Sequence, residues 1–565
     1  MGDSRPEPSS HHDDCDQDDA TMLMSISTPW PWRYWCRRNP VKSLVIFAVL
    51  LVASVLFSAL KDRSTDLMNI WILKTDGGKN NILLDEVLQE KYLGGLIAQG
   101  FDEKSCLSRH QSLWKHKGPQ PHRPSSHLIS KLRNYEKLHR RCGPHTKSFK
   151  KSLEYLNSSD HGNYDKITDC KYLVWKSRDG LGNRMITLVS AFLYALLTQK
   201  VLLVDPGAHI SGLFCEPFRG SSWLISSPII NRFMNFGRYS PHTYDYILKW
   251  ENRSVIPPYA FMYLAHDYTE EDKRFFCDED QAFIRKVPWL VIQSNVYFVP
   301  SLFLMPSFQK ELNLLFPEKQ TVFHFLGRYL FHPTNSVWNS ITTYYNSYLA
   351  SADEKIGIQI RIFRTNPDPF NELLEQILAC VIKENAVLPQ INDKMMMKPG
   401  GVQSNRTKAV LLTSLDIRYF DAIKKMYEEN STQTGEIIQV FQPSNETKQD
   451  SYNHIQNMKA LAEMYLLSLT DKLVTSSKST FGYVAQSLGG MRPWILYRPE
   501  EYNATDSKPA CQRALSMEPC FQAPPTLECK TRERVDTGKI VGYVRHCEDM
   551  SWTWGLKLYD KPDDP

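Results

Sequence analysis

Arg361 is the side chain in this sequence that is best suited to bind an anion. It interrupts a run of isoleucines between Lys355 and Phe363, and this β-branched apolar run predicts a strand covered on both faces. Arginine is almost never fully buried without a partner, so we expect Arg361 at the end of the strand, where open α/β sheets bind ligands. A planar, permanently charged guanidinium suits a diphosphate. A structural salt bridge to a carboxylate is the alternative interpretation.

A hydroxyl-rich segment in the same half of the chain could bind the same anion. Residues 471–485 have the pattern of a strand, a Ser/Thr-rich loop and the beginning of a helix. Hydroxyl groups and the free backbone N–H groups of a helix N-terminus form an anion site. Ser479 could instead serve only as the N-cap of the helix. Because Arg361 lies in the same half, we favour a lobe that binds a diphosphate.

A glycine-rich turn occupies residues 179–184 in the first half of the chain. Between Lys171 and Val204 the sequence predicts a strand, this turn, a helix and a second strand, which together form a βαβ unit. Gly180 and Gly182 let the backbone of the turn approach a ligand. Their spacing matches neither the dinucleotide fingerprint nor the phosphate loop, so the turn alone does not predict nucleotide binding. A purely structural turn is the alternative.

The remaining elements indicate an α/β protein with two lobes. We expect a buried strand at 409–416, another strand at 436–441 and an amphipathic helix at 457–469. The stretch between Arg361 and about Thr407 is expected to be irregular. The chain beyond its N-terminal region is too long for a single hydrophobic core. It should therefore divide into two lobes, each with its own βαβ-like half.

The acidic segment Asp278–Asp280 and two histidines do not predict a metal site. An Asp-x-Asp pair commonly holds a metal in nucleotide-sugar enzymes of another fold, but here we favour a solvated acidic loop. His324 and His454 have no partner at the spacing of metal ligands or of a catalytic triad. We expect both histidines to be structural.

The N-terminal region predicts a membrane anchor. Leu44–Leu60 is apolar and uncharged, and its length lies at the short end of what spans a bilayer. More basic residues precede this segment than follow it, which keeps the N-terminus cytoplasmic. We therefore expect a cytoplasmic tail at 1–40, an anchor at 41–60 and a lumenal stem at 61–89. A cleaved signal peptide is the alternative.

Two features place the rest of the chain in an oxidising lumen. Acceptor triplets for N-glycosylation occur at Asn157, Asn252, Asn405, Asn430, Asn445 and Asn503. A C-terminal cluster of cysteines predicts disulfides, and it consists of Cys511, Cys520, Cys529 and Cys547. A zinc site is the alternative, although the cluster contains no Cys-x-x-Cys pair. The net charge of +5 over 565 residues does not favour a nucleic acid partner.

Together these segments resemble the plant xyloglucan fucosyltransferases, Golgi enzymes that transfer L-fucose from GDP-fucose to galactose on xyloglucan side chains. The matching segments are 93–108, 180–184, 213–218, 325–333, the Arg361 strand and 479–494. The resemblance implies an α/β fold of the variant GT-B type, with two Rossmann-like lobes preceded by a single transmembrane helix. It implies an N-terminal acceptor-side lobe at 90–350, a C-terminal GDP-fucose-binding lobe at 351–500 and a disulfide-rich C-terminal segment at 501–565.

The resemblance also implies a set of site residues. The donor would be bound by Arg361, Ser479, Thr480, Phe481, Tyr483 and Asp549, and Arg361 would stabilise the leaving diphosphate. The acceptor or the cleft would involve Gly180, Gly182, Asn183, Arg184 and Asn295. The resemblance provides no general base for this chain. Some family members have an aspartate where this chain has Asn295, and an amide cannot accept the proton. Either another group or a chain of waters takes it, or the mechanism is dissociative with late loss of the proton.

The implied activity is the transfer of fucose, with inversion and in α-1,2 linkage, to a terminal galactose of cell-wall xyloglucan. The enzyme would be a single-pass type II Golgi membrane protein with a lumenal catalytic domain. Its partners would be GDP-fucose, a galactosylated polysaccharide and the Golgi membrane, and neither a metal nor a cofactor is expected because arginine supplies the positive charge. The alternatives are another galactosylated cell-wall glycan, such as arabinogalactan protein, and a non-catalytic glycan-binding role. The sequence leaves the oligomeric state open, a homo-oligomer included.

Overall fold

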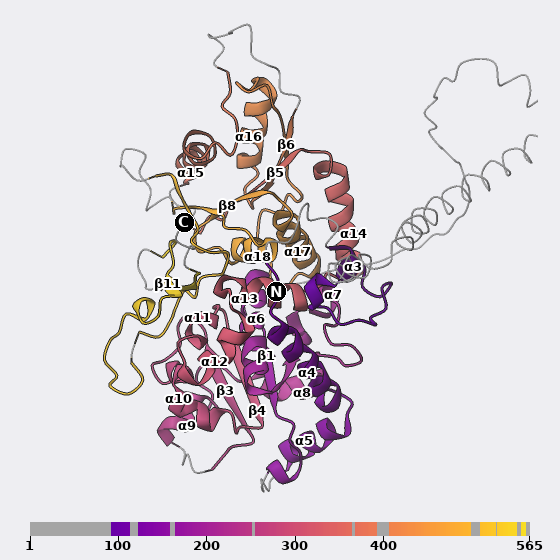
Figure 1. Cartoon of the computed structure of the whole chain (residues 1–565), viewed down its shortest axis with the longest axis vertical. Coiled ribbons are helices and arrows are strands. Elements are labelled where there is room, and N and C mark those ends of the chain that lie inside the picture. The colour runs from indigo at the N-terminus through magenta and orange to yellow at the C-terminus, as the bar shows by residue number, and fades with distance from the viewer. Residues whose placement is uncertain are drawn as a thin grey trace, which may run out of the picture. The chain divides into compact units, whose positions relative to one another are not determined.

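Two β-sheets organise the part of the chain that the structure describes (Figure 1). The computed structural model describes residues 92–112, 122–158, 164–208, 210–250, 255–363, 368–392, 406–498, 509–526, 528–550 and 555–560. The predicted cytoplasmic tail, anchor and stem lie outside the described residues. So do the glycosylation triplets at Asn252, Asn405 and Asn503.

The first sheet consists of four parallel strands in the order β2-β1-β4-β3. Its strands are β1 (Tyr172–Lys176), β2 (Val201–Val204), β3 (Tyr259–Leu264) and β4 (Trp289–Ser294). Every side chain of β1 and β2 is buried, as expected for a parallel sheet covered on both faces. Helix α6 (Leu181–Thr198) connects β1 to β2, which confirms the predicted βαβ unit.

The second sheet has six strands in the order β10-β9-β8-β5-β6-β7. Its strands are β5 (Glu354–Gln359), β6 (Thr407–Thr413), β7 (Ile437–Phe441), β8 (Lys472–Ser476), β9 (Trp494–Leu496) and β10 (Cys511–Arg513). All neighbouring pairs are parallel except β9 and β10, which are antiparallel. The isoleucine strand predicted before Arg361 is β5, and it lies between β6 and β8 in the interior of the sheet. The fold class is therefore α/β with parallel sheets, as expected.

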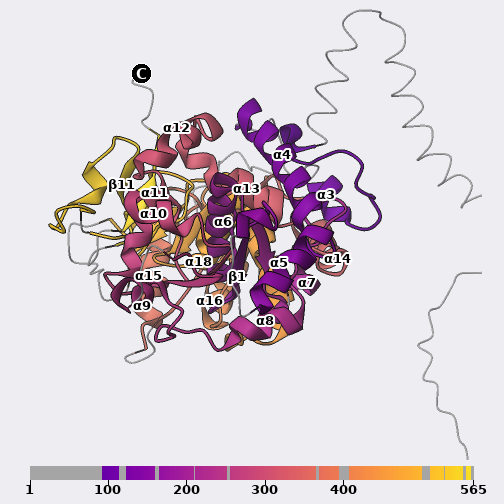
Figure 2. The ribbon, with the colours of Figure 1, turned by 90° about the horizontal axis from the view of Figure 1, so that it is seen from below.

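Helices cover both sheets (Figures 1 and 2). Those that precede β5 are α3 (Leu107–Gln111), α4 (Ser126–Cys142), α5 (Lys147–Asn157), α7 (Ile210–Leu213), α8 (Ser227–Met234), α9 (Tyr244–Trp250), α10 (Asp278–Ile284), α11 (Val299–Leu302), α12 (Pro306–Leu315), α13 (Val322–Leu330) and α14 (Asn335–Tyr344). Those that follow β5 are α15 (Phe370–Leu378), α16 (Arg418–Glu429), α17 (His454–Ser468) and α18 (Thr480–Gly489). A small antiparallel pair, β11 (Val544–His546) and β12 (Leu556–Leu558), completes the described elements.

Helices α17 and α18 join the core of the first sheet to that of the second. Leu461 and Met464 of α17 and Val484 and Leu488 of α18 belong to the same apolar cluster as the residues of β1 and α6. Among the described residues, α6 is the one helix long and apolar enough to cross a membrane, and most of it is buried inside the protein. This property therefore marks α6 as a core helix.

Two sequence predictions about local structure were wrong. The stretch between Arg361 and Thr407, expected to be irregular, contains helix α15. The acidic segment expected to be a solvated loop instead begins helix α10, and Asp280 is buried. Its carboxylate accepts hydrogen bonds from the Tyr244 hydroxyl at 2.6 Å and from Arg274 Nε at 3.1 Å. These contacts give Asp280 a structural role.

The ten described cysteines form five disulfides, which confirms that the C-terminal cysteines are oxidised. The pairs are Cys106–Cys215, Cys142–Cys170, Cys277–Cys529, Cys380–Cys511 and Cys520–Cys547. The clustered cysteines do not pair only among themselves, because Cys511 and Cys529 connect to distant parts of the chain. The disulfide Cys277–Cys529 joins residues 252 positions apart in the sequence. The C-terminal segment is thus covalently attached to the region of the first sheet.

Candidate active site

A cavity of about 400 Å³ lies at the carboxyl ends of strands from both sheets. Residues after β1, β5, β6, β7 and β8 all contribute to its wall. The lining residues include Asp179, Gly180, Gly182, Asn183, Gln359, Arg361, Phe363, Thr413, Glu446, Asp450, Glu463, Lys478, Ser479, Thr480 and Phe481. In α/β proteins this edge of a parallel sheet is the usual place for ligands. The structure therefore brings the predicted turn at Gly180 and the predicted anion-binding residues to one cavity.

Arg361 lies two residues beyond the end of β5 and lines this cavity. Its backbone N–H donates to Ser476 Oγ at 2.9 Å, which fixes the start of the loop. Burial lowers the pKa of the guanidinium. Within the part of the chain that the structure describes, no carboxylate forms an ion pair with it. The structural salt bridge considered above is therefore absent from these residues.

The ring of Phe363 lies beside the Arg361 guanidinium. The guanidinium carbon of Arg361 lies 5.4 Å from the centre of the ring, and that of Arg498 lies 5.1 Å from it. Cations near an aromatic face are attracted by its quadrupole. Phe363 is about half exposed and lines the cavity, so this cation–aromatic group lies at the wall where a ligand would enter.

Ser479 is the N-cap of α18 and also lines the cavity. Its Oγ accepts a hydrogen bond from the backbone N–H of Gly482 at 3.4 Å. The two interpretations of this residue are therefore compatible, because a capped helix N-terminus still presents the backbone N–H groups of its first turn. Those N–H groups belong to Thr480 and Phe481, which line the same cavity.

Tyr483 and Asp549 support this loop from the inside of the protein. Both are buried, and neither is among the residues that line the cavity. The Tyr483 hydroxyl donates to Asp549 Oδ2, and the backbone N–H of Lys478 donates to the same oxygen at 2.8 Å. Lys478 has a positive φ of 58°, a strained conformation for a lysine. Asp549 thus holds the turn that leads into α18.

The glycine-rich turn meets the N-terminus of α18 across the cavity. A Cβ on Gly182 would lie 2.7 Å from Thr480 Oγ1 and 3.0 Å from the Phe481 nitrogen, so only glycine permits this approach. Thr480 Oγ1 donates to Asn183 Oδ1 at 3.0 Å. Arg184 is buried and donates through Nη2 to the Ser451 carbonyl at 2.9 Å. The glycine-rich turn, which was predicted to approach a ligand, therefore contacts residues that follow β7 and β8 in the second sheet.

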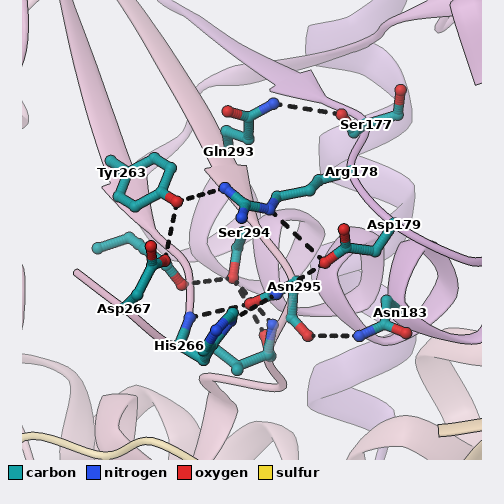
Figure 3. A network of polar contacts seen from close by, with 12 residues as sticks. Ser177, Arg178, Asp179, Asn183, Tyr263, His266, Asp267, Gln293, Ser294 and Asn295 are labelled. Atoms are coloured by element: carbon teal, nitrogen blue, oxygen red, sulfur yellow. Dashed lines mark hydrogen bonds and ion pairs between the residues drawn. The ribbon is translucent and has the colours of Figure 1, made fainter. Parts of the chain in front are cut away.

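A polar network follows β1, β3 and β4 at the same edge of the first sheet (Figure 3). Arg178 donates to the Tyr263 hydroxyl, which in turn donates to Asp267 Oδ1 at 2.8 Å. Asn295 Nδ2 donates to Asp179 Oδ2 at 2.7 Å, and the Asn295 carbonyl accepts from Asn183 Nδ2 at 2.9 Å. Asn295 is buried and is not among the residues that line the cavity, but it contacts Asp179, which does line it. The sequence analysis did not single out Asp179 as a site residue.

Glu463 is a second carboxyl that the sequence analysis did not identify. It lies on α17, lines the cavity and accepts a hydrogen bond from Ser444 Oγ at 2.5 Å. Burial, with a smaller contribution from Glu446, raises the pKa of Glu463 to about 7. A carboxyl with a perturbed pKa inside a cavity is a functional candidate. Its position in an amphipathic helix gave no sign that it faces a cavity rather than solvent.

Cavities at this edge of parallel strands are where α/β enzymes bind phosphorylated ligands, and this cavity offers both a cation and a helix N-terminus to such a ligand. The fold and the cavity thus define an α/β protein whose cavity has groups of the kind that bind phosphorylated ligands. Comparisons with known proteins agree with this class. Residues 64–530 match the family model described as xyloglucan fucosyltransferase.

Relatives with names and a solved structure give the same family. A galactoside 2-alpha-L-fucosyltransferase of Pisum sativum is 50% identical over 541 residues, which cover 93% of this chain and 94% of that protein. A galactoside 2-alpha-L-fucosyltransferase of Arabidopsis thaliana is 51% identical over 519 residues, covering 91% of each. The structure of an arginine-to-lysine mutant of Arabidopsis thaliana FUT1 in complex with GDP is 54% identical, with a TM-score of 0.75, covering 83% of this chain and 100% of that chain. The chain belongs to the xyloglucan fucosyltransferase family.

Proposed function

We propose that this protein is a GDP-fucose-dependent galactoside 2-α-L-fucosyltransferase that fucosylates a terminal galactose of cell-wall xyloglucan, with inversion. Family membership supports the transfer of fucose, and the names of the relatives support a galactoside acceptor. The observation that carries the proposal is the Arg361 guanidinium. It lines the cavity, and among the described residues it has no carboxylate as an ion-pair partner.

Arg361 and the first turn of α18 are placed to bind the diphosphate of the donor. When the bond between fucose C1 and the diphosphate breaks, negative charge grows on the β-phosphate. Donors that already point at this position lower the barrier without reorganisation. Thr480 and Phe481 contribute backbone N–H groups, and Arg361 contributes a charged fork. In this proposal Tyr483 and Asp549 act by holding the loop, since both lie behind it.

Glu463 is placed to recognise the guanine base. A guanine ring presents an N–H and an amino group on one edge, and a carboxylate can accept hydrogen bonds from both. The cavity extends from Arg361 to Glu463, so a nucleoside diphosphate can occupy it with its phosphates at one end and its base at the other. A carboxyl at this position would also discriminate against a base that presents an acceptor instead.

The proposed architecture is a variant GT-B fold with an acceptor-side lobe before residue 351 and a donor lobe after it. The two parallel sheets and the cavity between their carboxyl ends support this proposal. The proposed location is the Golgi membrane, with residues 41–60 as a single-pass anchor and the catalytic part in the lumen. Five disulfides support an oxidising compartment, and the exposed Asn157 and Asn445 are accessible for glycosylation.

The proposal is tested with the full-length chain in detergent, supplied with GDP-fucose and a panel of acceptors. The panel contains galactosylated xyloglucan, xyloglucan without galactose, arabinogalactan protein and a free β-galactoside. We expect fucosylated product only where galactose is present, sensitivity of that product to an α-1,2-fucosidase, and unchanged rates in EDTA. Product on arabinogalactan protein but not on xyloglucan would change the acceptor assignment. GDP binding without product on any acceptor would support a non-catalytic glycan-binding protein.

A further inference from the structure

The transfer reaction needs a group that removes the proton from the attacking galactose hydroxyl. This requirement rests on the proposed function. Asn295, which lies at the end of β4 in the network of Figure 3, carries an amide that cannot take this proton. A side chain that acts as the base would therefore be a different one, and the residues that line the cavity beside the first sheet are the candidates.

Asp179 is a carboxylate at that place. It follows β1, lines the cavity and has a side chain that is 43% exposed. Its backbone has a φ of 60°, in the left-handed region. Non-glycine residues held in this region occur often at functional sites, where the surrounding structure enforces them. The helix that begins at Leu181 follows directly, so the carboxylate is attached to a rigid element on each side.

Contacts occupy only one of the two carboxylate oxygens of Asp179. Oδ2 accepts a hydrogen bond from Asn295 Nδ2 at 2.7 Å and lies 3.6 Å from Arg178 Nε (Figure 3). The structure gives Oδ1 no hydrogen-bond donor among the described residues. This oxygen is therefore available to a hydroxyl group that enters the cavity.

Asn295 is itself fixed so that it can only donate to Asp179. Its Oδ1 accepts from the backbone N–H of His266 at 2.9 Å, and a backbone N–H cannot act as an acceptor. The amide nitrogen must therefore point to Asp179, and its second hydrogen reaches His266 Nδ1 at 2.9 Å. Asn295 is buried, so this orientation is maintained by packing as well. Asn295 therefore gives Asp179 a hydrogen bond without adding a second charge to the pair.

We propose that Asp179 is the general base of the transfer and that Asn295 is its positioning residue. The acceptor O2 forms a bond to C1 of fucose while the bond from C1 to the β-phosphate oxygen breaks and its electron pair leaves with GDP. The proton of the O2 hydroxyl passes to Asp179 Oδ1. The charged groups that face Asp179 are Arg178 on its own loop and Arg184 on α6, with the His266 ring beyond Asn295.

The first test compares Asp179→Asn with the wild-type chain. The expected result is a loss of about 10²–10⁴-fold in the rate of transfer to galactosylated xyloglucan, with the Kd for GDP changed less than threefold. The wild-type kcat, measured at saturating GDP-fucose so that donor binding does not contribute, should fall on acidification with the slope of a single protonation. The residual kcat of Asp179→Asn should lose this dependence. Asp165→Asn is the matched control, because Asp165 is exposed and precedes the opposite end of β1. Its rate should equal that of the wild type.

The second test moves the carboxylate within the network. Asn295→Asp alone places two carboxylates side by side, so the acidic limb of the pH–rate profile should shift to higher pH. The double variant Asp179→Asn with Asn295→Asp restores one carboxylate beside an amide, and we expect it to recover at least tenfold over Asp179→Asn.

Three results would overturn the assignment or its premise. A rate of Asp179→Asn above a third of the wild-type rate, with the acidic limb retained, excludes Asp179 as the base. A large loss of GDP affinity in Asp179→Asn would show instead that Asp179 shapes the donor site. A wild-type chain that forms no fucosylated product on any acceptor would refute the proposed function and, with it, the base. That last result is seen in the wild-type chain alone, so failure of the proposed function can be distinguished from failure of the assignment of Asp179 as the base.

Discussion

The Thr480 hydroxyl donates a hydrogen bond to Asn183 Oδ1 at 3.0 Å, and this contact joins the first turns of α18 and α6. Asn183 also donates to the main-chain oxygen of Asn295 at 2.9 Å. A single asparagine therefore connects the cavity-lining loop before α18 to the network around Asp179. Movement of one lobe relative to the other would break a hydrogen bond on this path, so the separation between donor and acceptor groups depends on it.

Replacing Arg361 with alanine should remove the principal charged donor to the leaving diphosphate. Loss of one preorganised donor typically costs about 10²–10³-fold in rate, and we expect at least this loss of kcat together with weaker GDP binding. Arg361→Lys should recover only part of the rate, because a point charge cannot reproduce the fork. Arg140→Ala, on the exposed part of α4, is the control. An early melting transition with normal turnover would mean that Arg361 is structural.

Replacing Gly182 with alanine should separate the two helix N-termini. The new Cβ would lie 2.7 Å from Thr480 Oγ1 and 3.0 Å from the backbone nitrogen of Phe481. A side-chain rotation cannot relieve the contact with the backbone, so the helix start itself would have to shift. We expect a lower Tm and weaker GDP binding in the same variant, measured by calorimetry. Gly237→Ala is the matched control, since a Cβ there meets no atom within 4 Å. Equal behaviour of the two variants would contradict the close contact between α6 and α18.

Replacing Glu463 with glutamine should selectively weaken the binding of GDP. Hydrogen bonds to a charged group contribute about 1.5–3 kcal/mol each, so we expect the Kd for GDP to rise at least about tenfold. The Kd for UDP should change little, because uracil lacks the amino group that the carboxylate would accept from. Because the pKa of Glu463 is raised to about 7, its carboxylate forms as the pH rises through this value, and GDP binding should tighten between pH 6 and pH 8. Isothermal titration at three pH values measures both effects. A pH-independent Kd would place the guanine elsewhere.

Buried Glu518 should make the ligand-free protein less stable as the pH rises. Its Oε2 accepts from the Tyr297 hydroxyl at 2.5 Å and its Oε1 from the Phe323 N–H at 2.7 Å, and burial raises its pKa to about 8. The folded pKa lies above the unfolded one, so the folded protein binds more protons between about pH 4.5 and 8. The free energy of unfolding therefore falls with rising pH in this window, by at most about 1.4 kcal/mol per pH unit for one group.

The Glu518→Gln variant isolates this contribution. Its amide is neutral at every pH, so the decrease in Tm from pH 5 to pH 8 should become shallower. Asp272, whose pKa burial raises to about 7, contributes with the same sign, and Asp272→Asn is the companion variant. Thermal unfolding of the apo protein across this range gives the slope. An unchanged slope in Glu518→Gln would show that Glu518 is ionised when folded.

Loss of the disulfide Cys277–Cys529 should destabilise the protein strongly. The bridge closes a loop of 252 residues and holds the C-terminal segment against the region of the first sheet. Removing a native disulfide typically costs about 2–5 kcal/mol, so the double variant Cys277→Ser with Cys529→Ser should melt well below the wild type. Mass spectrometry of the wild-type protein under non-reducing conditions should find the peptide pair linked. Free thiols at both positions would contradict the bridge.

The sequence predicted those parts of the site that follow from local pattern. The isoleucine run before Arg361 and the hydroxyl-rich loop before Tyr483 both carry periodicity that marks a strand end or a helix start. Asp179 and Glu463 carry no such mark. An aspartate in a turn and a glutamate in an amphipathic helix are both usual at the surface, and only the packing of α17 against the second sheet turns Glu463 into the cavity.

Contacts between residues far apart in the sequence could not be predicted either, because they depend on tertiary packing rather than on local pattern. Spacing identified Cys511 and Cys529 as oxidised, but not that they pair with Cys380 and Cys277. Helix α15 was missed although Phe370, Leu373 and Ile377 have helical spacing, because the surrounding stretch is irregular in composition. The resemblance placed Tyr483 at the donor, yet the Tyr483 hydroxyl points inward and donates to Asp549.

The distance in sequence between Cys277 and Cys529 also sets an order of events during synthesis. At about 5–20 residues per second, the 252 intervening positions take roughly 10–50 s to emerge. In that interval four earlier cysteines can already pair natively, as Cys106–Cys215 and Cys142–Cys170. Cys277 cannot, and the next thiol to appear is Cys380, whose own partner Cys511 is still absent. Both native bridges can therefore form only after the C-terminal segment that carries Cys511 and Cys529 has been made.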